Sequence, residues 1–300
     1  MFLKPPKAST DPSIRSLLQK AARRGFPTIV ELAVQRLDQL SDRSWLRSRA
    51  VVITFEECWP LADSLILTRQ LSSRRDAVLL VARATKQKDA AGLGALAYAY
   101  REGDRSMLGH VPDGRGLEIV AEAITQPDPF FEWAHLNSKS QRSRKIVSAA
   151  KQYLAAATWG WDKASILAGA FLASMGEPPE IALAETRSEQ FPYWVALDKH
   201  TPQGKPVLRE VAAQVKSSYR QLIWASFYCE SAAVNSLLPS PWWEAEKAWR
   251  LHRAGLTCQS ADELWARARD LIRVRLTSQA FSLEESIAGQ ATNKQRVMLS

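Results

Sequence analysis

Apolar side chains recur at helical spacing along most of the chain. The first stripe begins near Pro12 and consists of Ile14, Leu17, Leu18 and Ala21. Because residues three and four apart lie on one face of an α-helix, such stripes predict amphipathic helices that bury one side against a common core. Segment 45–59 is apolar on nearly every side, so we expect it near the centre of that core, although its run 51–55 is also compatible with a buried strand.

Further helical segments follow, separated by a few polar, Gly or Pro residues. They span residues 27–37, 61–71, 74–85, 90–100, 117–125, 140–159, 208–227, 242–253 and 261–275. Such short connections favour antiparallel packing of neighbours, and tight-turn signals between alternating strands are almost missing from the sequence. The pattern therefore predicts an all-α fold, a multi-helix bundle arranged as one unit or as two helical subdomains.

A stretch that is poor in large apolar residues suggests how the chain divides. Residues 176–191 include Glu177-Pro178-Pro179-Glu180, which is typical of a linker, and apolar content falls again from residue 278 onward. The division that we expect is a flexible N-terminus at 1–11, an N-terminal helical domain at 12–175, a connection at 176–197, a C-terminal helical domain at 198–277 and a flexible tail at 278–300.

Composition adds a basic surplus to this picture. The chain carries 40 Lys and Arg against 31 Asp and Glu, a formal net charge of +9, which favours polyanionic partners or an acidic protein surface. Its three cysteines are scattered and contain no C-x-x-C pair. With no secretory leader and no apolar run of membrane-spanning length, the sequence predicts a cytoplasmic protein.

Several basic residues are candidates for contact with nucleic acid, either DNA or RNA. The run 139–145, with serines between its cations, is typical of a junction that contacts phosphates through side chains and backbone amides. For any single cluster, a solvated helix face is the alternative. The nucleic-acid-binding residues that we expect are Arg23, Arg24, Arg74, Arg75, Lys86, Lys88, Lys139, Arg142, Arg144, Lys145, Lys199 and Lys205.

Motifs of known catalytic chemistry are missing from the sequence. The phosphate-loop consensus does not occur, and Gly92-Leu93-Gly94 lacks the strand and the third glycine of a dinucleotide site, so a helix start or close helix packing is the simpler interpretation. Glu56-Glu57 lies in the apolar segment 45–59, where we expect a buried ion pair with Arg47, Arg49 or arginines of adjoining helices, and a general base is the alternative. We therefore expect no catalytic residue, no metal site and no cofactor.

Residues 198–205 crowd an acid, an imidazole, a hydroxyl and two ammonium groups into one turn. We interpret this turn as the start of a helix, with Asp198 or Thr201 capping exposed amides. An enzyme that uses Asp198, His200 and Lys205 is the alternative, and it requires other polar groups to converge on the turn.

Eleven tryptophans are many for a chain of this length, and most are expected in the core. Trp242, Trp243 and Trp249 lie on predicted helices near the C-terminus, and we single them out as candidate contacts with a partner protein. They suggest an alternative function, a protein-interaction or collar subunit that binds an acidic partner.

Residues 17–62 resemble a known family. Arg24-Gly25, Asp42, Arg47, Arg49 and Glu56-Glu57 occupy places comparable to those in the helical C-terminal region of the replication-associated recombination ATPases related to clamp loaders, the MgsA/RarA family. In that family the region forms an oligomerisation collar, and its ATPase part has no counterpart here. The resemblance covers less than a third of the chain and implies a collar-like module in replication, repair or recombination. Together with the charge, it leads us to expect a non-catalytic, nucleic-acid-binding helical subunit of a larger nucleoprotein assembly, of a replication, recombination, repair or defence type.

Overall fold

Helices joined by short connections make up most of the chain in the computed structural model, which describes residues 12–40, 42–67, 71–186, 192–234 and 236–297. The α-helices are α1 (Pro12–Arg24), α2 (Pro27–Gln39), α3 (Arg43–Cys58), α4 (Leu71–Arg83), α5 (Asp89–Arg101), α6 (Gly114–Thr125), α7 (Pro127–Asn137), α8 (Gln141–Tyr153), α9 (Gly160–Met175), α10 (Gly204–Gln214), α11 (Tyr219–Ser226), α12 (Pro241–Arg253) and α13 (Cys258–Val297). Between them lie the 3₁₀ segments η1 (Trp59–Leu67), η2 (Leu154–Ala156) and η3 (Tyr193–Val195) and the π-helical turn η4 (Phe227–Ser231).

The predicted all-α fold is confirmed. Within the ranges just given, extended pairing is limited to isolated β-bridges, and the run 51–55 is helical rather than a strand. No helix in those ranges is both long and apolar enough to cross a membrane.

Local sequence signals explain where several helices begin and end. Gly25 follows α1 with a φ of 80°, a conformation that glycine adopts at little steric cost. Pro27 opens α2 at a position that needs no backbone donor. At the start of α8, the side chain of Ser140 accepts a hydrogen bond from the backbone N–H of Ser143. The predicted apolar stripe of α1 is buried, as its periodicity indicated.

The single helix expected at 208–227 is wrong, because the structure forms two. Helix α10 ends at Gln214, and Lys216 then adopts a φ of 53°, which breaks the helical path. Ser218 and Gln221 form a reciprocal capping box at the start of α11. The Ser-x-x-Gln spacing was the local signal for this break. It was overlooked because the apolar stripe continues at helical spacing through both helices.

Other elements also differ from expectation. Helices α7 and α9 were not predicted, since their apolar residues do not follow a clear single stripe. Helix α13 was expected to end near residue 275, yet it continues to Val297 through part of the segment that we expected to be a flexible tail. The segment expected to be an α-helix at 61–71 is instead the 3₁₀ segment η1 as far as Leu67.

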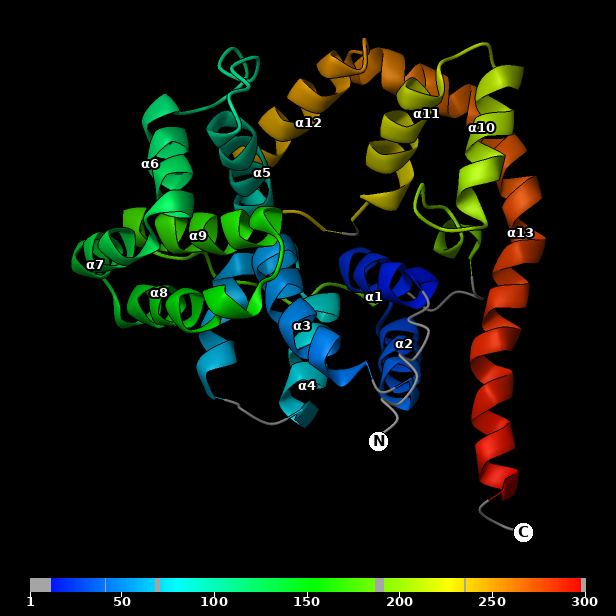
Figure 1. The fold of residues 1–300 in the computed structure, drawn as a ribbon, viewed down its shortest axis with the longest axis horizontal. Coiled ribbons are helices and arrows are strands. Elements are labelled where there is room, and N and C mark those ends of the chain that lie inside the picture. The colour runs from blue at the N-terminus through cyan, green and yellow to red at the C-terminus, as the bar shows by residue number, and fades with distance from the viewer. Residues whose placement is uncertain (1–11, 41, 68–70, 187–191, 235, 298–300) are drawn as a thin grey trace, which may run out of the picture.

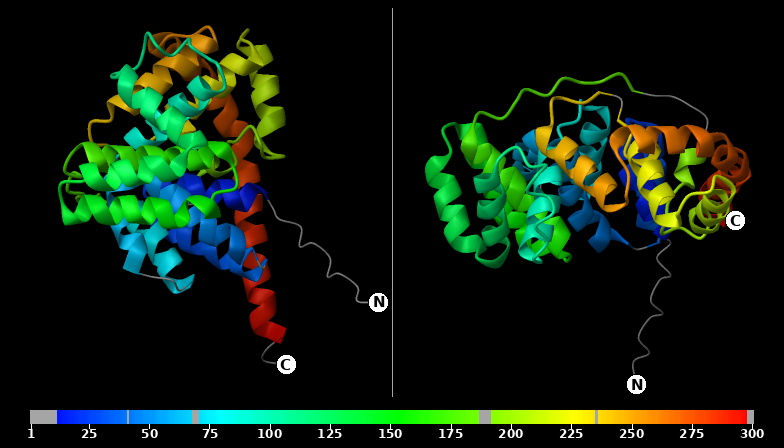
Figure 2. Two further views of the ribbon diagram at one scale, coloured as in Figure 1. Left: turned by 60° about the vertical axis from the view of Figure 1, so that its left-hand side comes forward. Right: turned by 90° about the horizontal axis from the view of Figure 1, so that it is seen from above.

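Buried side chains form three groups (Figure 1). The first lies among α3, η1, α5 to α9 and α12, the second among α1 to α4 with η3 and part of α13, and the third among α10 to α13 with η4. In Figure 1, α6 to α9 stand at one end of the molecule and α10 and α13 at the other, with α1 to α4 between them. Two further views in Figure 2 show α13 running past the body toward the C-terminus.

The cores do not separate at the expected connection, 176–197. Residues 177–186 run across the molecule (Figure 2, right), and η3 then places Trp194 and Val195 in the second group. Farther along, Trp242 and Trp249 of α12 join the first group, beside α5. The hydrophobic groups therefore draw on both sides of the expected boundary, and the division into domains stays a prediction. The N-terminus expected to be flexible, residues 1–11, lies outside the described residues.

Helix α5 packs unusually closely against its neighbours. A Cβ added to Gly92 would lie 2.3 Å from the backbone carbonyl carbon of Trp242, and one added to Gly94 would lie 2.6 Å from the backbone nitrogen of Ser165. The two glycines let α12 and α9 approach α5, which confirms the close-packing interpretation of Gly92-Leu93-Gly94.

Replacing Gly92 with alanine is expected to destabilise the protein by about 1–3 kcal/mol, since overpacking outweighs the better helix propensity of alanine. Urea unfolding measures the effect, and Gly109→Ala is the matched control because a Cβ there meets nothing within 4 Å. Equal stability of the two variants would contradict the close approach of α12.

Candidate functional site

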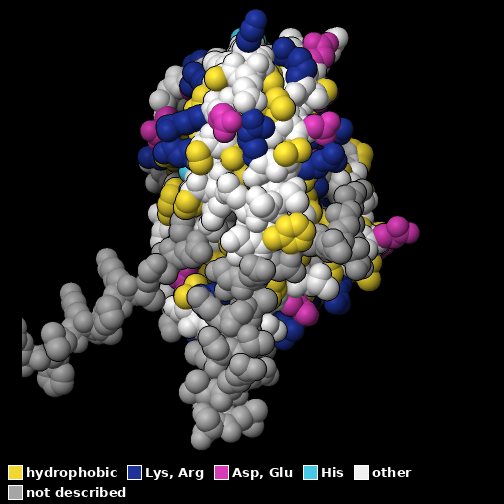
Figure 3. All heavy atoms as spheres, turned by 90° about the vertical axis from the view of Figure 1, so that its right-hand side faces the viewer, with side chains coloured by type: hydrophobic (Ala, Val, Ile, Leu, Met, Phe, Trp, Pro, Cys, Tyr) yellow, Lys and Arg dark blue, Asp and Glu magenta, His cyan; other side chains and the backbone are white. Residues whose placement is uncertain are grey.

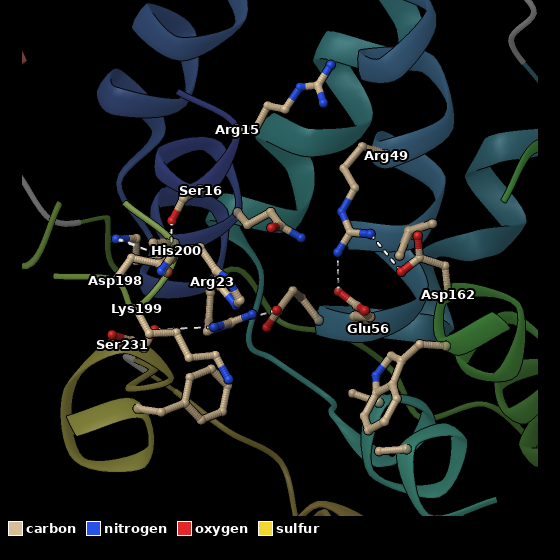
Figure 4. Close-up of a pocket in the computed structure, with 18 of the residues that line it drawn as sticks. Arg15, Ser16, Arg23, Arg49, Glu56, Asp162, Asp198, Lys199, His200 and Ser231 are labelled. Atoms are coloured by element: carbon tan, nitrogen blue, oxygen red, sulfur yellow. Dashed lines mark hydrogen bonds and ion pairs between the residues drawn. The ribbon is translucent and has the colours of Figure 1, made fainter. Parts of the chain in front are cut away.

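A cavity of about 720 Å³ lies between helices of the N-terminal half and segments that follow residue 197. One wall comes from α1, α3 and the start of α9, and the opposite wall comes from the turn at 198–200, α11, η4 and α12. Figure 4 shows side chains of both walls around one space. Ligand sites commonly enclose roughly 300–1,000 Å³, so this cavity is the candidate site.

Aromatic side chains stand on both walls. Trp161 lies in the first turn of α9 and Trp224 lies in α11. The guanidinium of Arg250 is 4.4 Å from the ring centroid of Trp161 and 4.9 Å from that of Trp224, and it also pairs with Glu246 one turn earlier on α12. Trp159 lines the cavity too and is 73% exposed. The site therefore offers flat aromatic surfaces on more than one side.

Arg49 of α3 bridges two carboxylates in the first wall. It donates hydrogen bonds to Asp162 at 2.8 Å and to Glu56 at 3.2 Å (Figure 4). Burial raises the pKa of the Glu56 carboxyl more than the positive charge of Arg49 lowers it. The buried ion pair predicted for Glu56 is confirmed with Arg49 as its partner, whereas Arg47 is exposed.

Glu57 is 1% exposed and binds cations from two other parts of the chain. Its carboxylate accepts hydrogen bonds from Arg23 Nε of α1 and from Lys88 Nζ at the start of α5, each at 2.7 Å. Burial alone would raise the pKa of this carboxyl, but Arg23 and Lys88 outweigh that effect and lower the pKa to about 2. The carboxylate therefore ties α1, α3 and α5 together at the edge of the cavity.

Lys20 of α1 anchors the segment that leads into the second wall. Its ammonium donates to the carbonyl oxygens of Trp194, Val195 and Leu197 at 3.2, 3.0 and 3.0 Å. The Asp198 carboxylate lies 4.0 Å from the same nitrogen. Burial lowers the pKa of Lys20 to about 8, although the charge of Asp198 opposes this change. These contacts place the turn after η3 directly against α1.

The turn before α10 serves the structural purpose that we expected. Thr201 Oγ1 accepts a hydrogen bond from the backbone N–H of Gly204 at 3.0 Å, and Asp198 accepts one from the N–H of His200 at 2.8 Å. Asp198 and His200 also line the cavity, but Lys205 is exposed and does not. The three residues of the enzyme alternative therefore do not share one space. Among the described residues, no group of His, Cys, Asp and Glu is arranged to bind a metal ion.

Lys199 faces the aromatic wall of the cavity. Its ammonium lies 4.7 Å from the ring centroid of Trp224. Burial, followed by the nearby charge of Arg250, lowers the pKa of Lys199, while Asp198 acts in the opposite direction. This lysine, Arg23 and Lys88 are the three predicted nucleic-acid-binding residues that line the cavity.

The basic residues predicted to bind nucleic acid differ in exposure, and the buried ones are not available to a polyanion, which corrects the prediction for those residues. The buried ones are Arg24, Arg74, Lys86 and Lys88. The half-buried ones are Arg23, Arg142 and Lys199. The exposed ones are Arg75, Lys139, Arg144, Lys145 and Lys205. The exposed side chains belong to α4, to α8 with the residue before its cap, and to α10, and Figure 1 places α8 and α10 at opposite ends of the molecule.

Structural contacts explain why these cations are withdrawn from the surface. Lys86 donates to the carbonyl oxygens of Val81 and Ala84, at 2.6 and 2.7 Å, near the end of α4. Arg142 reaches Asp63 at 3.2 Å and the carbonyl oxygen of Pro60 at 3.0 Å. Sequence alone cannot separate such residues from exposed cations, because each partner comes from the folded arrangement of the chain.

The three tryptophans singled out for partner binding are core residues. Trp242, Trp243 and Trp249 are 6%, 9% and 1% exposed. Trp242 and Trp249 pack with α5, and Trp243 packs in the third hydrophobic group and borders the cavity. Their burial corrects the expectation that they present a contact surface.

A basic face covers α10, α11 and the described part of α13. Of its residues, only Lys205 was among those predicted to bind nucleic acid. Its cations are Lys205, Arg209, Lys216, Arg220, Arg267, Arg269, Arg273 and Arg275. Its acids are Glu210, Asp262, Glu263 and Asp270. Figure 3 shows Lys and Arg gathered over the upper part of this side of the molecule with fewer acids among them. The basic run 267–275 was visible in the sequence, but only the fold sets it beside α10.

Because Glu57 is paired with two cations, we expect the free energy of unfolding to decrease at acidic pH. Because its pKa falls from the usual 4.5 to about 2, its contribution is complete above pH 4.5 and is lost as the pH falls from there toward 2. Glu57→Gln leaves two cations without their carboxylate, so we expect it to cost about 3–5 kcal/mol near neutral pH.

Urea unfolding between pH 6 and 3 tests both statements. The stability of Glu57→Gln should vary less with pH than that of the wild type. The control Glu31→Gln removes an exposed pair with Arg75 and should change stability by less than about 1 kcal/mol. A wild-type curve parallel to that of Glu57→Gln would contradict the assignment.

The chain matches no protein-family model, no curated protein and no solved structure. The resemblance of residues 17–62 to the clamp-loader-related ATPases therefore stays a prediction. The cavity and the basic face are the two features of the structure that bear on function.

Proposed function

We propose that the protein binds single-stranded nucleic acid as a non-catalytic subunit of a nucleoprotein assembly, with one unpaired base in the central cavity and the adjoining phosphates on the basic face of α10, α11 and α13. The observation that carries the proposal is that Trp161 and Trp224 both line one cavity, where the Arg250 guanidinium lies against both rings, and that the ionic groups of this cavity largely neutralise one another.

The chemistry of a nucleobase suits this interior. A base is flat and uncharged, and its edge carries both hydrogen-bond donors and acceptors. Aromatic walls stack on any base, a contact that is worth roughly 1–3 kcal/mol. The bridge from Arg49 to Glu56 and Asp162 supplies donors and acceptors together, so it suits a polar, neutral edge better than a bare phosphate.

The basic face is placed to receive the rest of the strand. Helix α11 carries Trp224 in the cavity wall and Arg220, four residues earlier, on the exposed face. The cavity turn at 198–200 leads directly into α10, which carries Lys205 and Arg209. Exposed Lys and Arg side chains supply the attraction to phosphates that gives nucleic-acid affinity its dependence on salt.

The expected location agrees with this proposal. The three cysteines of the protein are free in the structure, as is usual in a reducing compartment. We propose that the protein works in the cytoplasm, where nucleic acid is accessible.

Replacing Trp224 with leucine is expected to weaken the binding of a single-stranded oligonucleotide by about 5- to 100-fold, the equivalent of one lost stacking contact. Fluorescence titration measures the affinity, and Arg144→Gln on α8 is a control that should leave it unchanged. An intact duplex of the same sequence should bind more weakly. Equal affinity for duplex and single strand, or an unchanged Trp224→Leu, would refute the placement of a base in the cavity.

The basic face is tested separately through salt. The double variant Arg209→Gln/Arg220→Gln should lower the slope of log affinity against log salt concentration by about 1.4, at about 0.7 for each single-strand phosphate contact. The matched double variant Arg144→Gln/Lys145→Gln removes two exposed cations from α8 and should leave the slope unchanged. A larger change in slope from the α8 pair would contradict binding of the phosphates on the basic face and would indicate that they bind at α8.

A further inference from the structure

Lys199 differs from the other cations that line the cavity. The others have carboxylate partners: Arg15 pairs with Asp42, Lys20 with Asp198, Arg23 and Lys88 with Glu57, Arg49 with Glu56 and Asp162, and Arg250 with Glu246. Within the part of the chain that the structure describes, Lys199 forms no ion pair and no hydrogen bond through its ammonium group; it rests on the ring of Trp224. It is therefore the cavity cation most free to react with a ligand.

The surroundings of Lys199 favour a neutral amine. Its side chain is half-buried, and Arg250 lies over the same tryptophan ring, so a second positive charge is nearby. Burial and the charge of Arg250 both lower the pKa of Lys199, which increases the share of unprotonated amine at neutral pH. A lysine beside another cation in a partly apolar pocket is the arrangement in which an amine becomes a useful nucleophile toward carbonyl groups.

We propose that Lys199 captures an aldehyde held in the cavity as an imine, and that the aldehyde is the ring-opened C1′ carbonyl of an abasic nucleotide in a single strand. The proposal rests on the proposed function, because the strand brings the aldehyde to the cavity. Where a base is missing, the cavity is not filled by it, and C1′, the atom that carried the base, is the sugar atom directed into the cavity that Lys199 lines.

The covalent step balances without any further reactant. The ammonium first gives one proton to water, and the neutral Nζ then attacks C1′, whose carbonyl electron pair moves to oxygen. After proton transfer from nitrogen to that oxygen, the C–O bond breaks and the oxygen leaves as water, taking up the proton that the ammonium released. The net change converts one ammonium and one aldehyde into one iminium and one water. The result is stoichiometric capture of the strand rather than turnover.

Borohydride trapping tests the proposal on the full chain. A single-stranded oligonucleotide with one abasic site is incubated with the protein and reduced, and the adduct is located by peptide mass spectrometry. We expect most of the adduct on Lys199. Lys199→Arg, which keeps the charge, should form adduct at least tenfold more slowly, while Lys151→Arg, which removes an exposed amine in the last turn of α8, should react like the wild type. Mapping in the wild type does not depend on how either variant folds.

The outcomes separate this inference from the proposed function. Tight binding of the intact oligonucleotide without adduct, or adduct spread over exposed lysines such as Lys139, Lys145 and Lys205, overturns capture by Lys199 and leaves base binding standing. Failure of both the intact and the abasic strand to bind overturns the two proposals together.

Discussion

The fold depends on one buried carboxylate, that of Glu57. A charge at 1% exposure is tolerated only when it is paired, and the pairing here draws Arg23 from α1 and Lys88 from the start of α5 onto α3. Arg23 also donates to the carbonyl oxygen of Ser231 in η4, which extends the constraint to the C-terminal half. The backbone is drawn in as well, since Gln87 donates its N–H to the carbonyl oxygen of Glu57. Helices that are distant in sequence are thereby fixed around one point.

That constraint also explains why a cavity persists beside Glu57. Apolar side chains can close a gap by repacking, but the ionic groups of this region need partners in fixed directions. Lys20 is committed to three carbonyl oxygens and Arg49 to two carboxylates, so the walls keep their separation. The tryptophans then supply the apolar surface of the site. A region arranged in this way is stable and still accessible to a ligand, which is the physical basis of the proposed base binding and of capture by Lys199.

The basic surplus of the chain is divided between two uses. Part of it neutralises buried acids or caps helix ends, as Arg24 does with Glu230 and Lys86 with the end of α4. The remainder is exposed, and part of it gathers on the face of α10, α11 and α13 (Figure 3). Net charge therefore overstates what is available to a polyanion, because it counts the cations of the interior together with those of the surface.

Local properties of the sequence determined the helical class, the buried stripe of α1 and the need of Glu56 and Glu57 for cations, since periodicity and the cost of desolvating a carboxylate act within a few residues. The same local patterns led us to predict one helix in place of α10 and α11, and to expect Trp242 and Lys88 on the surface. Only the tertiary structure decided which cations meet Glu57, which tryptophans line the cavity and where the basic face lies. Those outcomes depend on residues from different helices, such as Arg23 and Glu57, which are 34 positions apart, and no short-range pattern specifies which partner each will meet.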